Sequence, residues 1–192
     1  MGRLRLRTFI AVLLDDAVRR RVTALRDELA SLAPDIKWVE PENLHVTMLF
    51  LGEVDALEVV DVCRAVREVC GQHPPLELTL AGVGCFPNER RPKVFWAGID
   101  QGREALIALH HALEAPLLRL GAYRREEREF TPHVTLGRAR GGEIPESLRQ
   151  HLKRAGQWRG GRLEVDAIHV MSSELTPQGP RYSVVSRETL GG

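Results

Sequence analysis

Two short segments of the chain nearly repeat each other about half a chain length apart. They read LHVTM, starting at residue 44, and PHVTL, starting at residue 132. Because side chains alternate between the two faces of a strand, His45 and Thr47 share a face, as do His133 and Thr135. The Val, Leu and Met side chains at the alternate positions are apolar and face the other way. This pattern predicts two strands, each buried on one face and directing a histidine and a threonine from the other.

Two imidazoles that meet in one cleft could act as the acid and the base on a single phosphate. The ordinary histidine pKa of about 6.5 makes both protonation states accessible near neutral pH. The hydroxyls of Thr47 and Thr135 could donate to phosphate oxygens, although threonine is also common in strands for its β propensity. A metal hydrolase would need a carboxylate or a third histidine at ligand spacing, and neither motif has one. We therefore expect no metal and no cofactor.

The composition is that of an ordinary globular protein, with 192 residues, 43% hydrophobic and 28% charged. A net charge of +1 argues against a protein that binds a long stretch of nucleic-acid backbone, but it is compatible with binding a short nucleic-acid end. Cys63, Cys70 and Cys85 form no Cys-x-x-Cys pair, which favours reduced, buried thiols. No apolar run has the length of a membrane span, and the start lacks a signal-peptide core. We expect a cytoplasmic monomer with no membrane partner.

Hydrophobic periodicity predicts four helices and several strands besides the two His-Thr strands. The helices are expected over about 16–32, 55–71, 102–120 and 145–155, and the further strands over 4–14, 37–39, 76–83, 93–99, 162–172 and 181–189. The order strand, helix, His-Thr strand, helix occurs in the first half and, more loosely, in the second, which indicates a duplicated unit. No linker is long enough to separate independent domains. Residues 1–192 are therefore expected to form a single domain of two similar lobes.

The paired His-x-Thr-x segments resemble the signature of the 2H phosphoesterases. Further landmarks extend the similarity to the branch of RNA 2′,3′-cyclic phosphodiesterases, historically called 2′-5′ RNA ligases (LigT-like). These landmarks run in order over nearly the whole chain: RTFIA from residue 7, WV from 38, PENLHVT from 41, FLGE from 50, FTPHVTLGR from 130, MSSEL from 171 and GPRY from 179.

The resemblance implies an α+β, bilobal fold, in which two pseudo-symmetric, mostly antiparallel sheets flank a central cleft with helices on the outside. It implies a substrate RNA with a 2′,3′-cyclic phosphate end, such as a tRNA fragment or short oligonucleotide, and a 2′-phosphate product. In the family's pattern His45 is the proton donor and His133 the proton acceptor, with Thr47, Thr135 and Arg138 binding the substrate and no metal. The residues alone do not distinguish this assignment from its swap.

Two other functions use the same residues. The reverse chemistry would join RNA ends through a 2′-5′ bond, and a non-catalytic module would only bind RNA ends. The paired histidines favour an enzyme over such a binding module.

Arg138 presents a conflict between the resemblance and the strand pattern. It lies five residues after His133, which places it on the opposite face of a straight strand. Gly137 could end or bulge the strand and redirect the arginine. Arg3, Arg5 and Arg7 precede the first predicted helix and form a basic stripe that could extend a path for RNA. His110 and His111 are expected on the surface of the third predicted helix.

Overall fold

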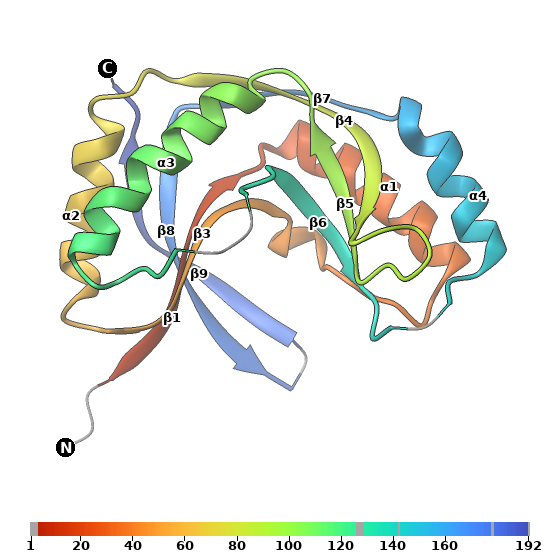
Figure 1. Ribbon diagram of the computed structural model, residues 1–192, viewed down its shortest axis with the longest axis horizontal. Helices are drawn as coiled ribbons and strands as arrows, with labels where there is room; N and C mark the ends of the chain where they lie inside the picture. The colour runs from red at the N-terminus through yellow and green to blue at the C-terminus, as the bar shows by residue number, and fades with distance from the viewer. Residues whose placement is uncertain (1–3, 126–128, 142, 178, 192) are drawn as a thin grey trace.

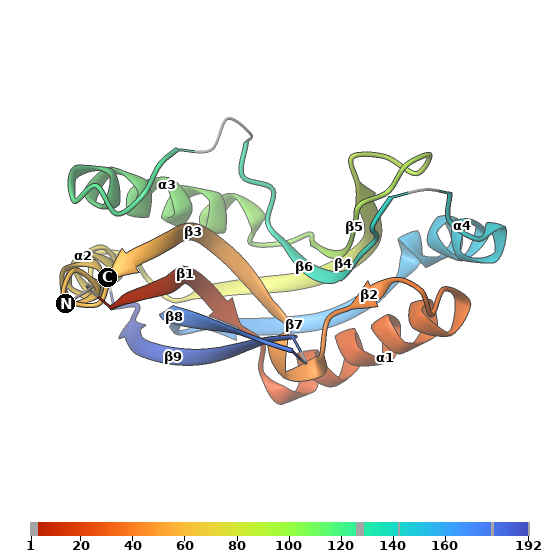
Figure 2. The ribbon, with the colours of Figure 1, turned by 90° about the horizontal axis from the view of Figure 1, so that it is seen from below.

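A computed structural model describes residues 4–125, 129–141, 143–177 and 179–191. Its strands form one strongly curled, antiparallel sheet in the order β7-β4-β5-β6-β3-β1-β8-β9, with β2 beside β6 (Figures 1 and 2). The strands are β1 (Arg5–Leu13), β2 (Lys37–Trp38), β3 (His45–Asp55), β4 (Leu76–Phe86), β5 (Val94–Ile99), β6 (His133–Arg138), β7 (Arg159–Val165), β8 (Ala167–Thr176) and β9 (Gly179–Thr189).

The sheet divides into two halves that meet where β3 lies beside β6. One half is β3-β1-β8-β9 and the other is β6-β5-β4-β7, so corresponding strands stand in the same order on either side. Val46 pairs with Val134 across the junction. The predicted α+β fold with two pseudo-symmetric antiparallel halves is therefore confirmed, and the halves are joined edge to edge into a half-barrel.

In the described part of the chain, four α-helices cover the convex face of this sheet: α1 (Asp16–Leu32), α2 (Val59–Cys70), α3 (Arg103–Arg119) and α4 (Glu146–Arg154). Asp15 caps α1, because its carboxylate accepts a hydrogen bond from the Val18 amide at 2.7 Å. Two of these helices reach across to the other half. Helix α1 follows β1 but packs near β6 and β7, and α3 follows β5 but packs against α2 and β3 as well as β4 (Figure 1).

The main core lies between the helices and the sheet, and a smaller apolar cluster lies on the concave face. Strand β1 contributes Ile10 and Val12 to the main core and Phe9 and Ala11 to the smaller cluster. Because β1 is covered on both faces, five consecutive residues from Thr8 to Val12 are buried. Met171 completes the concave cluster, against which Tyr182 packs. Among the described residues, no helix combines the length and apolar character needed to cross a membrane.

Two predicted boundaries were wrong. The segment 162–172 was predicted as one strand, but it breaks at Asp166, where the chain leaves one half of the sheet and enters the other as β8. The second helix begins at Val59 rather than near residue 55, because β3 continues to Asp55. The Asp55 carboxylate accepts a hydrogen bond from the Leu57 amide at 3.0 Å in the intervening turn.

Candidate active site

The two His-Thr motifs lie side by side at the centre of the sheet. The Val46–Val134 pair sets the antiparallel register of β3 and β6. In this register His45 stands beside Thr135, and Thr47 stands beside His133, all on the concave face. A local two-fold axis between the two valines therefore relates the two motifs, as the duplicated sequence pattern predicts.

Both imidazoles are oriented by the same local hydrogen bond. Nδ1 of His45 lies 2.7 Å from the carbonyl oxygen of Asn43, and Nδ1 of His133 lies 2.7 Å from that of Thr131. A carbonyl can only accept, so Nδ1 of each ring carries a proton and Nε2 is the nitrogen available for chemistry. Nε2 of His45 also lies 2.9 Å from Oγ1 of Thr47, so the ring nitrogen and the hydroxyl can contact the same phosphate.

Aromatic side chains pack around each imidazole. The rings of Phe9 and Tyr182 are centred 5.0 and 5.4 Å from that of His45. The ring of Phe86 is centred 5.3 Å from that of His133. These contacts fix the rings and exclude water from one side of each histidine.

This burial lowers the pKa of both histidines. Desolvation is the largest cause for His45 and for His133, and it is opposed by the backbone hydrogen bond that each makes. The charge of Arg138 lowers the pKa of both, and the charge of His133 lowers that of His45 further. Two imidazoles and a guanidinium thus interact electrostatically within one cleft.

The concave face holds a cavity of about 450 Å³, a volume suited to a nucleotide. His45, Thr47, Thr135 and Arg138 all line it, so the structure brings four of the five predicted site residues into one cavity. His133 is not part of the lining, but it lies two residues from Thr135 on the same face of β6. The other lining residues are Arg7, Thr8, Phe9, Val39, Asn43, Phe50, Gly52, Ser173 and Tyr182.

A β-bulge explains how Arg138 reaches the cavity. On β5, Phe95 pairs with Gly137 and Trp96 pairs with Thr135, which leaves Leu136 as an extra residue in β6. Leu136 and Gly137 are consequently both buried, and the next residue returns to the concave face. The conflict between the strand pattern and the resemblance is resolved by this bulge.

The same irregularity occurs in β3. On β1, Ile10 pairs with Leu49 and Ala11 pairs with Thr47, so that Met48 is the extra residue. Phe50 therefore occupies the position equivalent to Arg138, and it lines the cavity with 55% of its surface exposed. Sequence reasoning missed Phe50, although its offset of five from His45 equals that of Arg138 from His133.

Gly137 is required by the packing at the bulge. A Cβ atom at this position would lie 2.6 Å from a ring carbon of Trp38, which is itself fixed by a hydrogen bond from its Nε1 to the Ala33 carbonyl. We expect Gly137→Ala to lower the free energy of unfolding by about 1–3 kcal/mol through overpacking. Urea denaturation checks this value.

Gly156→Ala is the matched control, because nothing lies within 4 Å of the added atom. It should change the free energy of unfolding by less than about 0.5 kcal/mol. Equal stability of the two variants would contradict the proposed packing constraint.

Other residues singled out in the sequence have mixed outcomes. Arg7 lines the cavity, Arg5 is exposed, and Arg3 lies outside the described residues. Trp38 is half-buried and packs against the main core, with its ring centred 5.5 Å from that of Phe95. Cys70 is buried, and Cys63 and Cys85 are half-buried free thiols.

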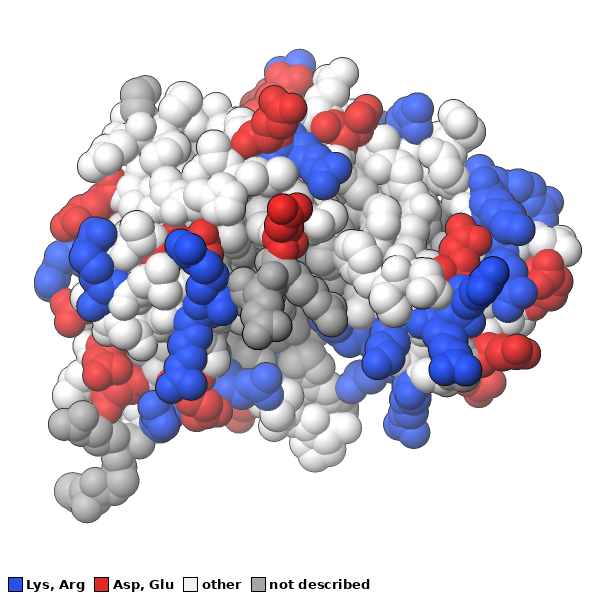
Figure 3. Space-filling model, in the orientation of Figure 1, with Lys and Arg blue, Asp and Glu red and all other residues white. Residues whose placement is uncertain are grey.

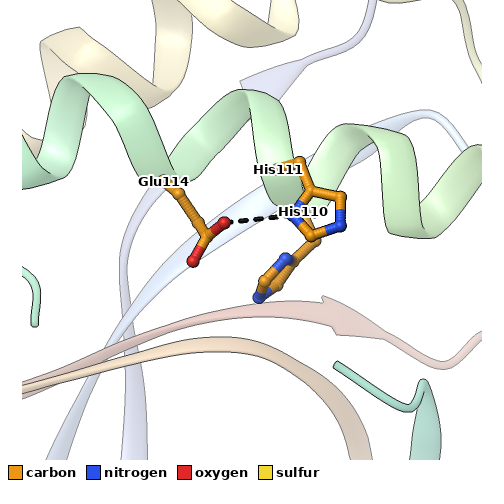
Figure 4. A group of neighbouring side chains, drawn as sticks. All are labelled: His110, His111 and Glu114. Atoms are coloured by element: carbon orange, nitrogen blue, oxygen red, sulfur yellow. Dashed lines mark hydrogen bonds and ion pairs between the residues drawn. The ribbon is translucent and has the colours of Figure 1, made fainter. Parts of the chain in front are cut away.

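The prediction that His110 lies on the helix surface was wrong. His110 is only 6% exposed, because it turns inward from α3 and stacks on Phe130 with ring centroids 4.1 Å apart. His110, His111 and Glu114 offer three possible metal-ligand atoms within 4.8 Å of one another (Figure 4). The Glu114 carboxylate already interacts with Nδ1 of His111 at 3.0 Å and with the Tyr123 hydroxyl at 3.3 Å. The hydrogen bond from Tyr123 to Glu114 therefore links the segment after α3 to the helix.

Comparison with known proteins decides the family. Residues 14–177 match the sequence model of the 2′-5′ RNA ligase superfamily, which spans most of the chain. The chain belongs to the 2′-5′ RNA ligase superfamily. The resemblance found in the paired motifs is thereby confirmed.

Two similar proteins carry the same name. An RNA 2′,3′-cyclic phosphodiesterase of Methanothermobacter thermautotrophicus is 33% identical over 94% of this chain and 96% of its own. One of Archaeoglobus fulgidus is 35% identical over 92% of this chain and 96% of its own.

Solved structures show the same fold. The crystal structure of TT0787 of Thermus thermophilus has a TM-score of 0.80 and 28% identity, covering 98% of this chain and 99% of that one. Escherichia coli LigT complexed with 3′-AMP has a TM-score of 0.75 and 26% identity, covering 98% of this chain and all of that one.

Proposed function

We propose that this protein hydrolyses the 2′,3′-cyclic phosphate at the end of an RNA chain and leaves a 2′-phosphate and a free 3′-hydroxyl. The observation that carries the proposal is the local two-fold arrangement of the two His-Thr motifs, in which His45, Thr47 and Thr135 line one cavity and His133 stands beside Thr47. The names of the superfamily members that are about one third identical over most of the chain support the same activity.

In the proposed reaction a water molecule attacks the phosphorus while the bond from phosphorus to the 3′-oxygen breaks. His133 accepts the proton that the water loses, and His45 donates a proton to the departing 3′-oxygen. One imidazole gains a proton as the other loses one, and exchange with solvent restores both. The two rings have nearly the same geometry, so the acid and base assignment follows the family's pattern.

The remaining cavity residues bind the substrate. The hydroxyls of Thr47 and Thr135 stand beside the imidazoles and can donate to the phosphoryl oxygens. Arg138 supplies a planar guanidinium that suits two oxygens of one phosphate. Phe50 offers its exposed face to the base of the terminal nucleotide, since unpaired bases stack on aromatic side chains. All of these steps use groups of the chain itself and water, so the mechanism needs no metal.

The first experiment determines the product of an RNA oligonucleotide that ends in a 2′,3′-cyclic phosphate. Chromatography against standards should show a 2′-phosphate end, and excess EDTA should leave the rate unchanged. A 3′-phosphate product would show that the bond from phosphorus to the 2′-oxygen breaks instead. Loss of activity with EDTA and its recovery with zinc or manganese would contradict the acid–base mechanism. Binding of the oligonucleotide without turnover would favour an RNA-end binding module.

A further inference from the structure

We propose that the RNA upstream of the cyclic end lies over a basic surface beside the cavity, so that single-stranded oligonucleotides are better substrates than cyclic mononucleotides. This basic surface consists of Arg90, Arg91 and Lys93 in the β4–β5 loop, Arg140 after β6, and Arg149 in α4. The inference rests on the proposed function, because it concerns the remainder of the same substrate.

Strand pairing places the basic surface next to the cavity. Arg138, which lines the cavity, pairs with Val94 on β5, directly after Lys93. The Ala139 amide donates to the Lys93 carbonyl at 3.0 Å, which joins the β4–β5 loop to the segment leaving β6. Lys37 pairs with Arg138 from the other side. Figure 3 shows Lys and Arg side chains gathered at the lower right, where Figure 1 places this loop and the β6–α4 connection.

The surface is concave. Arg90, Arg91, Lys93 and Arg149 line a second, open cavity of about 610 Å³ together with Gly141 and Glu143. The loop that carries the two adjacent arginines is itself organised. The Asn88 side-chain oxygen accepts hydrogen bonds from the Arg90 and Arg91 amides at 3.0 and 3.2 Å. The guanidinium groups therefore project from an ordered turn rather than from a loose loop.

Most of the basic side chains here form no ion pair with the protein's own carboxylates. Residues 87–93 and 137–149 hold six basic and three acidic side chains, whereas the whole chain holds 27 and 26. Arg149 pairs with Glu146 at 3.4 Å. Within the part of the chain that the structure describes, no carboxylate lies within 4.0 Å of the charged groups of Arg90, Arg91, Lys93 or Arg140. Arginines elsewhere, such as Arg64, Arg162 and Arg187, are in ion pairs.

These observations fit RNA phosphates better than any other anion. The terminal nucleotide fills the cavity, and its chain must leave toward the 5′ side. Arg138 stands where the cavity meets the basic surface. Each successive phosphate adds one negative charge, which a basic side chain can neutralise with release of counterions. A local surface of this size serves a few phosphates, which is consistent with the small net charge of the whole chain.

The test compares two substrates and two matched double variants. The substrates are adenosine 2′,3′-cyclic phosphate and a single-stranded RNA of about ten nucleotides with a 2′,3′-cyclic end. The variants are R90Q/R91Q, in the basic surface, and R103Q/R119Q, at the two exposed ends of α3. Each double variant removes the same charge, so their difference isolates position. Anisotropy of a labelled oligonucleotide with a 3′-phosphate measures binding independently of turnover.

We expect R90Q/R91Q to raise KM for the oligonucleotide and weaken its binding about tenfold, with adenosine 2′,3′-cyclic phosphate hydrolysed as by the wild type. The slope of log binding constant against log salt should fall by about 0.7 for each phosphate contact removed. R103Q/R119Q should match the wild type on both substrates.

An unchanged oligonucleotide KM and binding constant in R90Q/R91Q, an equal loss on both substrates, or an equal loss in R103Q/R119Q would overturn the inference. Failure of the proposed function has a different signature. In that case the wild type hydrolyses neither substrate, while the anisotropy difference between the two double variants still decides whether RNA lies over the basic surface.

Discussion

Replacement of His45 or His133 with alanine is expected to lower the rate of cyclic phosphate hydrolysis by roughly 10²–10⁴, the usual contribution of a positioned acid or base. The two histidines lie on paired strands and interact electrostatically, and in the proposed mechanism they act on one phosphate. The double variant should therefore lose much less than the product of the two single losses, because groups that work as a unit are strongly non-additive. Initial rates with the cyclic-ended oligonucleotide measure all three variants.

His73→Ala is the control for the loss of an imidazole. His73 follows α2 and bonds the Val69 carbonyl through Nδ1 at 2.8 Å, without lining the cavity. It should keep nearly normal rates. His110 is unsuitable as a control, because its buried ring packs on Phe130. A folded His45 or His133 variant that retains most of its activity would refute the paired acid–base mechanism, and circular dichroism establishes whether each variant is folded.

Arg138→Ala is expected to lower kcat/KM by about 10²–10³, the effect of removing one strong donor to a developing negative charge. It should also move the pH profile. The positive charge of Arg138 lowers the pKa of both histidines, so its removal raises both pKa values. The base must be neutral and the acid protonated, so kcat/KM rises through one pKa and falls through the other. Both limbs therefore shift to higher pH, starting from a wild-type optimum below the ordinary histidine pKa of about 6.5.

Arg138→Lys separates the charge of this residue from its geometry. Lysine retains a positive charge near both histidines but lacks the planar fork that binds two oxygens. Its pH profile should stay close to that of the wild type, while its kcat/KM remains reduced. An Arg138→Ala variant whose profile does not move would show that the guanidinium does not act on the imidazoles. Arg119→Ala, at the exposed end of α3, controls for the loss of an arginine.

Much of this site could be predicted from local sequence periodicity. The alternation around His45 and His133 placed each histidine and threonine on one face of a strand. The helix expected over 16–32 is α1, whose buried residues follow helical spacing: Val18, Val22, Leu25 and Leu29. These features depend only on residues a few positions apart in the chain, within two helical turns or a few strand residues. They can therefore be predicted from one sequence without knowledge of the tertiary structure.

The features that periodicity missed depend on distant partners. Leu136 and Met48 read as ordinary strand residues, and only the pairing of β6 with β5 and of β3 with β1 identifies each as the extra residue of a bulge. The break at Asp166 is similar, because Val165 and Ala167 continue an apolar pattern while their strands join opposite halves of the sheet. The burial of His110 depends on Phe130, which lies in a later segment.

The exchange of helices between the two halves bears on how a duplicated chain of this kind could begin. Helix α1 leaves β1 to pack beside β6 and β7, and α3 leaves β5 to pack beside β3. A single unit would therefore send its first helix away from the strand before it and leave part of the apolar face of its strands in water. A second copy would supply the missing cover, in the manner of a domain-swapped pair. An ancestral unit of this design would have folded as a symmetric dimer, with one histidine from each subunit at the shared cleft.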